Sequence, residues 1–233
     1  SKNLKAVVLR EGTPPAPRDP AAMARITDSF AARMRANDLS RWQLEPPGFS
    51  CWIYLHGLDA ALCVNNYRES SFPGIEGFRE EGFKARQIHD LGCPGCPNAC
   101  IKAILPRDAT AIDARGCGIH QEITGTMGPN IGVGDLDVVL RANHLCNQLG
   151  MDPTSLGFTL SCAMELAERG IRDAGIRFGD GEGALAMAER IARREGEGRL
   201  LAEGSLRYGR GVGGGAAQYA MQVKGLETVC LEP

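Results

Sequence analysis

The sequence of 233 residues predicts a mainly α, multi-helical domain with a few short strands at its edges. Apolar residues recur at spacings of three and four in several segments, as on one face of an amphipathic helix. Glycine and proline separate these segments, and both residues commonly end helices. The strand-like stretches are short and isolated. We therefore expect one domain over residues 1–233.

The first half of the chain predicts helices interrupted by extended segments. Asp19 followed by Pro20 is a favourable helix start, with Asp as the cap and Pro in the first turn. The expected elements are a strand over residues 5–10, helices over 20–36, 55–64 and 78–89, and an extended segment over 101–112.

The second half is expected to be almost entirely helical. Gly150 should end the first of its helices, because glycine favours the left-handed conformation found after helix ends. The expected elements are helices over residues 135–149, 154–169, 183–194 and 200–210, and a strand-like piece over 219–223.

The overall composition excludes several classes of protein. The net charge of −2 gives no basic footprint for nucleic acid. No apolar run approaches the roughly 20 residues that a spanning helix needs, so no membrane partner is expected. The first residues lack a secretory pattern. We expect a soluble cytoplasmic protein.

Cysteine is the unusual feature of the composition. The chain has nine cysteines, an odd number that argues against a disulfide framework in a protein without an export signal. Cys93, Cys96 and Cys100 form the pattern Cys-x2-Cys-x3-Cys. Prolines and a glycine within this segment favour a turning loop rather than a helix. Close cysteines of this kind can wrap one metal centre.

Three interpretations of this loop remain open. A [4Fe-4S] cluster needs four thiolates, of which the loop supplies three. Zinc also accepts three cysteines and one histidine, and His89 lies four residues before Cys93. The third interpretation is three reduced structural cysteines without metal. Cys117 or Cys230 could add a fourth ligand, whereas Cys51, Cys146 and Cys162 lie in apolar settings typical of buried small side chains.

Several segments, taken in order, carry a family likeness. The cysteine loop resembles that of the tungsten-containing aldehyde ferredoxin oxidoreductases. Five further blocks resemble those of the same family in the same order, and the likeness covers nearly the whole chain. These blocks are residues 1–6, 128–136, 142–152 and 201–204, followed by 223–227 near the end.

The resemblance implies roles for particular residues. Cys93, Cys96 and Cys100 would bind the [4Fe-4S] cluster. Asn147, Gly150, Met151 and Asp152 would match a pterin-contacting motif, with Asn and Met where the family usually has Asp and Leu. Asp152 is equally suited to cap the helix that follows it. Glu122 stands where the family carries an active-site glutamate, in the sequence His-Gln-Glu-Ile rather than Glu-Tyr-Glu-Thr.

The resemblance also implies an activity. The complete enzyme would oxidise a small aldehyde to a carboxylate at a tungsten-bis-pterin centre and pass electrons through the cluster to ferredoxin. Residues 1–10 would be the tail end of a preceding, pterin-cradling domain. The chain would then lack that domain and a last domain that supplies the fourth cluster cysteine, and it would have little or no activity alone.

Two alternatives stay open beside this expectation: a zinc-stabilised helical interaction domain, and a related aromatic thioester reductase. The sequence leaves undecided the choice between tungsten and molybdenum and whether the chain forms a homodimer.

Overall fold

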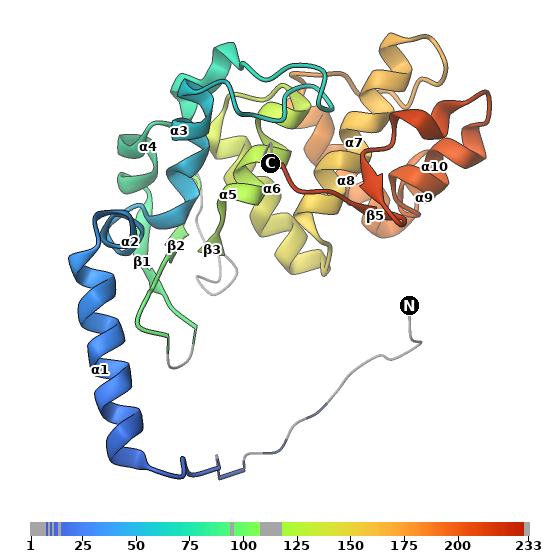
Figure 1. Cartoon of the computed structure of the whole chain (residues 1–233). Coiled ribbons are helices and arrows are strands. Elements are labelled where there is room, and N and C mark those ends of the chain that lie inside the picture. The colour runs from blue at the N-terminus through green and yellow to red at the C-terminus, as the bar shows by residue number, and fades with distance from the viewer. Residues whose placement is uncertain are drawn as a thin grey trace.

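The structure, a computed structural model, describes residues 8, 10, 12–13, 15–93, 96–107 and 118–230. It confirms the expected mainly α class. Figure 1 shows a body of packed helices from α5 onward beside a small sheet, with α1 extending away from both. Among the residues of α1 none is buried. The α-helices are α1 (Pro20–Ala36), α2 (Asp38–Leu44), α3 (Trp52–Leu58), α4 (Glu80–Lys84), α5 (Gln121–Met127), α6 (Leu136–Leu149), α7 (Pro153–Glu168), α8 (Gly181–Arg193), α9 (Gly198–Leu201) and α10 (Ser205–Val212).

The small sheet positions the cysteine loop. Its order is β1-β2-β3 and both pairings are antiparallel. Asp90 of β1 lies opposite Lys102 of β2. The residues between β1 and β2 include all three clustered cysteines, which therefore occupy the connection of a hairpin. The strands are β1 (Gln87–Leu91), β2 (Ile101–Ile104) and β3 (Gly118–Ile119), with a separate pair β4 (Gln222–Val223) and β5 (Leu226–Glu227).

Helix α7 runs through the centre of the core. Every residue from Leu156 to Leu166 is buried. Gly157 allows α7 to approach α5 closely, because a Cβ atom there would lie 2.5 Å from the carbonyl oxygen of Thr126. Asp152 caps the start of α7 and Gly150, in the left-handed conformation, ends α6. The short link between α6 and α7 is thereby fixed at both ends.

Three expected helices were wrong in extent. The helix expected over 55–64 is α3 (Trp52–Leu58), and Val64 instead forms an antiparallel bridge with Glu69. The helix expected over 78–89 is only Glu80–Lys84, because Gln87–Leu91 forms strand β1 and pairs with β2. The helix expected over 200–210 is divided into α9 and α10. Gly204 stands between them with φ +86, a backbone conformation that interrupts a helix.

Two expected extended segments lie partly outside the described residues. The strand expected over 5–10 lies outside them except for Val8 and Arg10, which are in no strand. The extended segment expected over 101–112 forms β2 as far as Ile104, and residues 108–112 lie outside. In the described part of the chain, no helix combines the length and apolar character needed to cross a membrane.

Candidate functional site

The cysteine loop presents its thiols on the surface. Cys93 and Cys96 are exposed and Cys100 is half-buried, and all three are free thiols. The backbone N–H of Cys96 donates to the carbonyl oxygen of Cys93 at 3.0 Å. The N–H of Asn98 donates to Cys96 Sγ at 3.4 Å.

The residues present fit a metal in kind and in accessibility. Three free thiols on one hairpin connection match the soft ligands of iron–sulfur clusters and zinc. Among the described residues, which leave out Pro94, Gly95 and Cys117, no group of three His, Cys, Asp or Glu side chains is gathered closely enough to hold an ion. His89 lies within β1 opposite Ala103.

An aromatic contact joins the cysteine loop to helix α5. The N–H of Phe49 donates to the carbonyl oxygen of Cys100 at 2.9 Å. The Phe49 ring lies 4.6 Å from the ring of His120, centroid to centroid. His120 caps α5, because its Nδ1 accepts the N–H of Glu122 at 3.3 Å. Burial lowers the pKa of His120, and the carboxylate of Glu122 acts in the opposite direction. The structure thus brings Glu122 and the cysteine loop into one connected region.

Glu122 also contacts the carboxyl-terminal end of the described chain. Its Oε2 accepts the N–H of Cys230 at 3.0 Å. Burial, and then the charge of Glu122, raise the pKa of the Cys230 thiol well above its ordinary value. Cys230 packs against Gly125 of α5, where an added Cβ would lie 2.2 Å from its Sγ. Cys230 therefore belongs to the surroundings of Glu122.

Met151 and Asp152, which follow Gly150, line a small pocket of about 200 Å³. Asp152 Oδ1 accepts the N–H of Thr154 at 3.0 Å, and Oδ2 accepts the hydroxyl of Ser155 at 3.0 Å. The expected capping role of Asp152 is confirmed. Met151 and Asp152 share the pocket with Ala202 and Gly204. Two blocks of sequence that carried the family likeness therefore meet in space.

Asn147 does not line this pocket. Its side-chain amide donates to the carbonyl oxygen of Asn143 at 2.9 Å and to Asn143 Oδ1 at 3.2 Å. Asn143, which is 1% exposed, donates in turn to the carbonyl oxygen of Gly118 in β3 at 3.0 Å. The sequence pattern did not single out Asn143 as a candidate. It could have been identified as a polar residue on the apolar face of the helix expected over 135–149.

Cys63 is buried, as are the three cysteines expected to act as small apolar side chains. Cys51, Cys146 and Cys162 are buried, and burial raises the pKa of each thiol to about 12. Such thiols stay protonated and behave as small apolar side chains. Cys117 lies outside the described residues.

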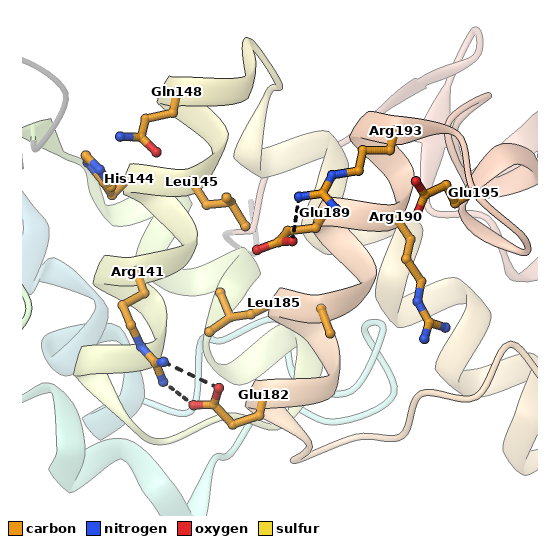
Figure 2. Close-up of a pocket in the computed structure, with 11 residues that line it drawn as sticks. Arg141, His144, Leu145, Gln148, Glu182, Leu185, Glu189, Arg190, Arg193 and Glu195 are labelled. Carbon is orange, nitrogen blue, oxygen red and sulfur yellow. Dashed lines mark hydrogen bonds and ion pairs between the residues drawn. The ribbon is translucent and has the colours of Figure 1, made fainter.

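A larger hollow of about 550 Å³ lies between α6 and α8 (Figure 2). Arg141 pairs there with Glu182, and Arg193 pairs with Glu189 at 3.2 Å. In Figure 2 the first pair joins α6 to α8, and the second pair joins neighbouring turns within α8. None of the site residues predicted from the sequence lines this hollow. Size alone therefore does not identify the candidate site.

Comparison with known proteins agrees with the sequence likeness. The family profile described as aldehyde ferredoxin oxidoreductase, domains 2 and 3, matches residues 25–233. The chain is 30% identical over 242 residues to the tungsten-containing aldehyde ferredoxin oxidoreductase of Pyrococcus furiosus, in a match that spans 100% of this chain and 39% of that protein. The protein of the same name from Pyrococcus horikoshii is 30% identical over 244 residues, with the same shares covered.

More distant likenesses extend the comparison. The aliphatic sulfonate oxidoreductase, WOR-like subunit, of Pyrococcus furiosus is 26% identical, and the match covers 97% of this chain and 38% of that subunit.

A solved structure, the active site complex BamBC of benzoyl coenzyme A reductase with 1,5 dienoyl-CoA, shares the fold with a TM-score of 0.69. It is 19% identical, and the match covers 90% of this chain and 33% of that chain. The chain thus spans about two fifths of the length of the curated relatives it matches. The profile match and the identity along the whole chain show that this protein belongs to the aldehyde ferredoxin oxidoreductase family.

Proposed function

We propose that this chain is the cluster-binding section of a longer oxidoreductase that oxidises a small aldehyde to a carboxylate and delivers electrons to ferredoxin. The observation that carries the proposal is the separation of the cysteines into two kinds. Cys93, Cys96 and Cys100 are accessible on one hairpin connection, whereas the other described cysteines are buried. Accessible, clustered thiols serve as ligands, and buried ones serve as packing.

The three loop thiolates would each bind one iron of a [4Fe-4S] cluster. The fourth iron needs a ligand from outside the loop. Cys230 is an unfavourable source, because it packs against α5 and its thiol stays protonated. A cysteine from another part of the longer protein remains the simplest source, as the family likeness implies.

The α6–α7 link would contact a pterin. A tungsten-bis-pterin centre, held by the complete enzyme, would supply the two-electron acceptor for the oxidation. The carboxylate of Asp152 uses one lone pair on each oxygen for Thr154 and Ser155, which leaves further lone pairs for ring N–H and amino donors. Met151 would form the neighbouring wall, Gly150 would end α6 beside it, and Asn147 would stiffen the end of α6 through Asn143.

Glu122 would accept a proton during the reaction. Oxidation of an aldehyde by water yields a carboxylate, three protons and two electrons, so the site needs a proton acceptor beside the substrate. Glu122 is half-buried at the start of α5, and its Oε2 is held by the N–H of Cys230. The two electrons would leave singly through the cluster to ferredoxin.

Metal analysis with an optical spectrum tests the proposal directly. The chain is purified without air, reconstituted with iron and sulfide, and compared with Cys96→Ala and with Cys162→Ala, a matched change at a buried cysteine. We expect iron, sulfide and broad absorption in the blue for the unaltered chain and for Cys162→Ala, and loss of both in Cys96→Ala. Alone, the chain should not reduce a viologen dye when an aldehyde is added, because most of the enzyme's length is absent.

A zinc-stabilised helical interaction domain is the competing function. Stoichiometric zinc without iron, together with failure of anaerobic reconstitution, would replace the oxidoreductase proposal with it. An aromatic thioester as substrate remains an alternative within the oxidoreductase proposal, since the likeness to a benzoyl coenzyme A reductase complex is one of fold. Assays of the complete enzyme with an aldehyde and with an aromatic thioester separate these substrates.

A further inference from the structure

A fully buried lysine lies at the base of the cysteine loop. Lys102, two residues after Cys100, has no exposed surface although it carries an ammonium group. Its Nζ donates to the carbonyl oxygens of Leu44 at 2.7 Å and Ala99 at 2.9 Å, and lies 3.0 Å from Asp90 Oδ1. Burial of an ammonium is costly unless its donors are satisfied, and here all three have acceptors.

Each acceptor belongs to a different piece of the chain. Leu44 is the last residue of α2, where the unpaired carbonyls of a helix end favour a cation. Ala99 belongs to the cysteine loop, and Asp90 belongs to β1. Lys102 therefore ties the loop to a helix end and to the neighbouring strand. A second contact between the same loop and α2, from Asn98 Nδ2 to Gln43 Oε1 at 3.3 Å, supports this tie.

The carbonyl group of Cys100 is also fixed, by residues that pack against the methylene chain of Lys102. The N–H of Phe49 donates to that carbonyl oxygen, and Gly48, with φ +69, lies directly against both. A Cβ atom at Gly48 would lie 2.4 Å from the oxygen of Cys100 and 2.9 Å from Cε of Lys102. The backbone of residues 48–49 thus covers the stem of Lys102 and leaves no space for a side chain.

We propose that Lys102 is a positioning residue for the cluster: it fixes the Cys100 side of the cysteine loop and supplies a buried positive charge at the base of that loop. This inference rests on the proposed function. Thiolates and a reduced cluster are anionic, and a cation in a desolvated site acts on them more strongly than one in water. Lys102 therefore favours the reduced form of the cluster and raises its reduction potential.

The first experiment compares Lys102→Met with Lys84→Met in the reconstituted chain. A small thiol in the buffer occupies the fourth iron, and dithionite supplies the single electron for reduction of the cluster. Lys84 is a half-exposed residue of α4 that pairs with Glu80, so its change removes one charge away from the loop. We expect Lys102→Met to lower the reduction potential and to release iron to a chelator about tenfold faster. Lys84→Met should match the unaltered chain in both.

A second variant keeps the test informative if Lys102→Met folds poorly. Asp90→Asn removes the negative partner of Lys102 but leaves its two carbonyl contacts, so it should raise the potential. The Asp90 side chain is 54% exposed, so water screens its carboxylate. The rise in reduction potential in Asp90→Asn should therefore be smaller than the fall in Lys102→Met. A lower or unchanged potential in Asp90→Asn, or an unchanged potential in folded Lys102→Met, would overturn the electrostatic part of the proposal.

A measurement on the metal-free chain separates this inference from the proposed function. The alkylation rate of each cysteine is followed by mass spectrometry in the unaltered chain and in Lys102→Met. Cys100 should react about tenfold faster in the variant, whereas exposed Cys93 should change little. Failure of the unaltered chain to bind a cluster refutes the proposed function alone. Equal alkylation of Cys100 in both proteins refutes the positioning role of Lys102.

Discussion

Asp152 caps a helix and, in the proposed function, would also contact a cofactor. Both of its oxygens accept hydrogen bonds from the first turn of α7, and its side chain also lines the pocket shared with Ala202 and Gly204. A cap needs only one oxygen acceptor, which serine can also provide. A pterin contact needs the remaining lone pairs and the charge of the carboxylate. The two roles can therefore be separated by substitution.

Replacement of Asp152 by alanine should lower the free energy of unfolding by about 1 kcal/mol, because α7 loses its cap. Asp152→Ser should cost only a few tenths of a kcal/mol, about the difference between two good caps. Urea denaturation of the purified chain measures both. A loss in Asp152→Ser as large as that in Asp152→Ala would show that the charge, rather than the cap, stabilises this helix start.

At the scale of elements, the close approach of α5 and α7 depends on a single glycine. A Cβ atom at Gly157 would meet the backbone of Thr126, which cannot move without displacing α5. Displacement of α5 would also move Glu122, which lies in its first turn. The packing of these two helices thus fixes the candidate catalytic carboxylate.

Gly157→Ala should lower the free energy of unfolding by about 2 kcal/mol, a typical cost of overpacking a core. The matched control is Gly211→Ala in α10, where an added Cβ meets nothing within 4 Å. That change should raise stability by about 0.5 kcal/mol, because alanine favours a helix over glycine. Thermal unfolding of both variants measures these opposite signs. Equal effects would contradict the proposed contact.

The pairing of elements also explains why the helix expected over 78–89 was wrong. Residues 78–89 have the charged, periodic pattern of a surface helix, but Gln87–Leu91 pairs with Ile101–Ile104. Strand pairing joins residues far apart in sequence, and a local pattern does not contain that information. Long helices such as α6 and α7 were predicted within about one residue, because their caps and apolar spacing are local.

For the whole molecule, one ion pair joins the sheet region to the helical body. Arg86, immediately before β1, donates from Nε and Nη2 to the carboxylate of Asp137 at 2.9 and 2.8 Å. Asp137 lies in the first turn of α6, and the two side chains are 8% and 22% exposed. The hydrogen bonds from Arg86 are the main cause of a lowered pKa at Asp137, with a further contribution from the N–H of Arg107. The pair therefore stabilises the folded chain.

This pair should make stability depend on pH in the acid range. Because the pKa of Asp137 is lower in the folded chain than its ordinary 3.8, its contribution is complete above that value and is lost as the pH falls through the folded pKa. Asp137→Asn should lower the free energy of unfolding by about 2 kcal/mol near neutral pH. This value lies between the typical costs of breaking an exposed ion pair and a fully buried one. The cost should shrink below pH 3.8.

Urea unfolding of Asp137→Asn and of the unaltered chain across this pH range measures the effect. Asp173→Asn is the control, because it removes a carboxylate from an exposed pair with Arg177 and should change stability less. A pH-independent cost of Asp137→Asn would contradict the role of the ionised carboxylate.

The sequence by itself determined the helical class and the caps at Asp19, Asp152 and Gly150, and it predicted an accessible cysteine cluster apart from buried cysteines. These features depend on neighbouring residues, so a local pattern contains them. Only the tertiary structure decided that Lys102 is fully buried at the base of the cysteine loop and that the N–H of Cys230 donates to Glu122. Both contacts join segments that are far apart along the chain, and their energy comes from burial, which no local pattern specifies.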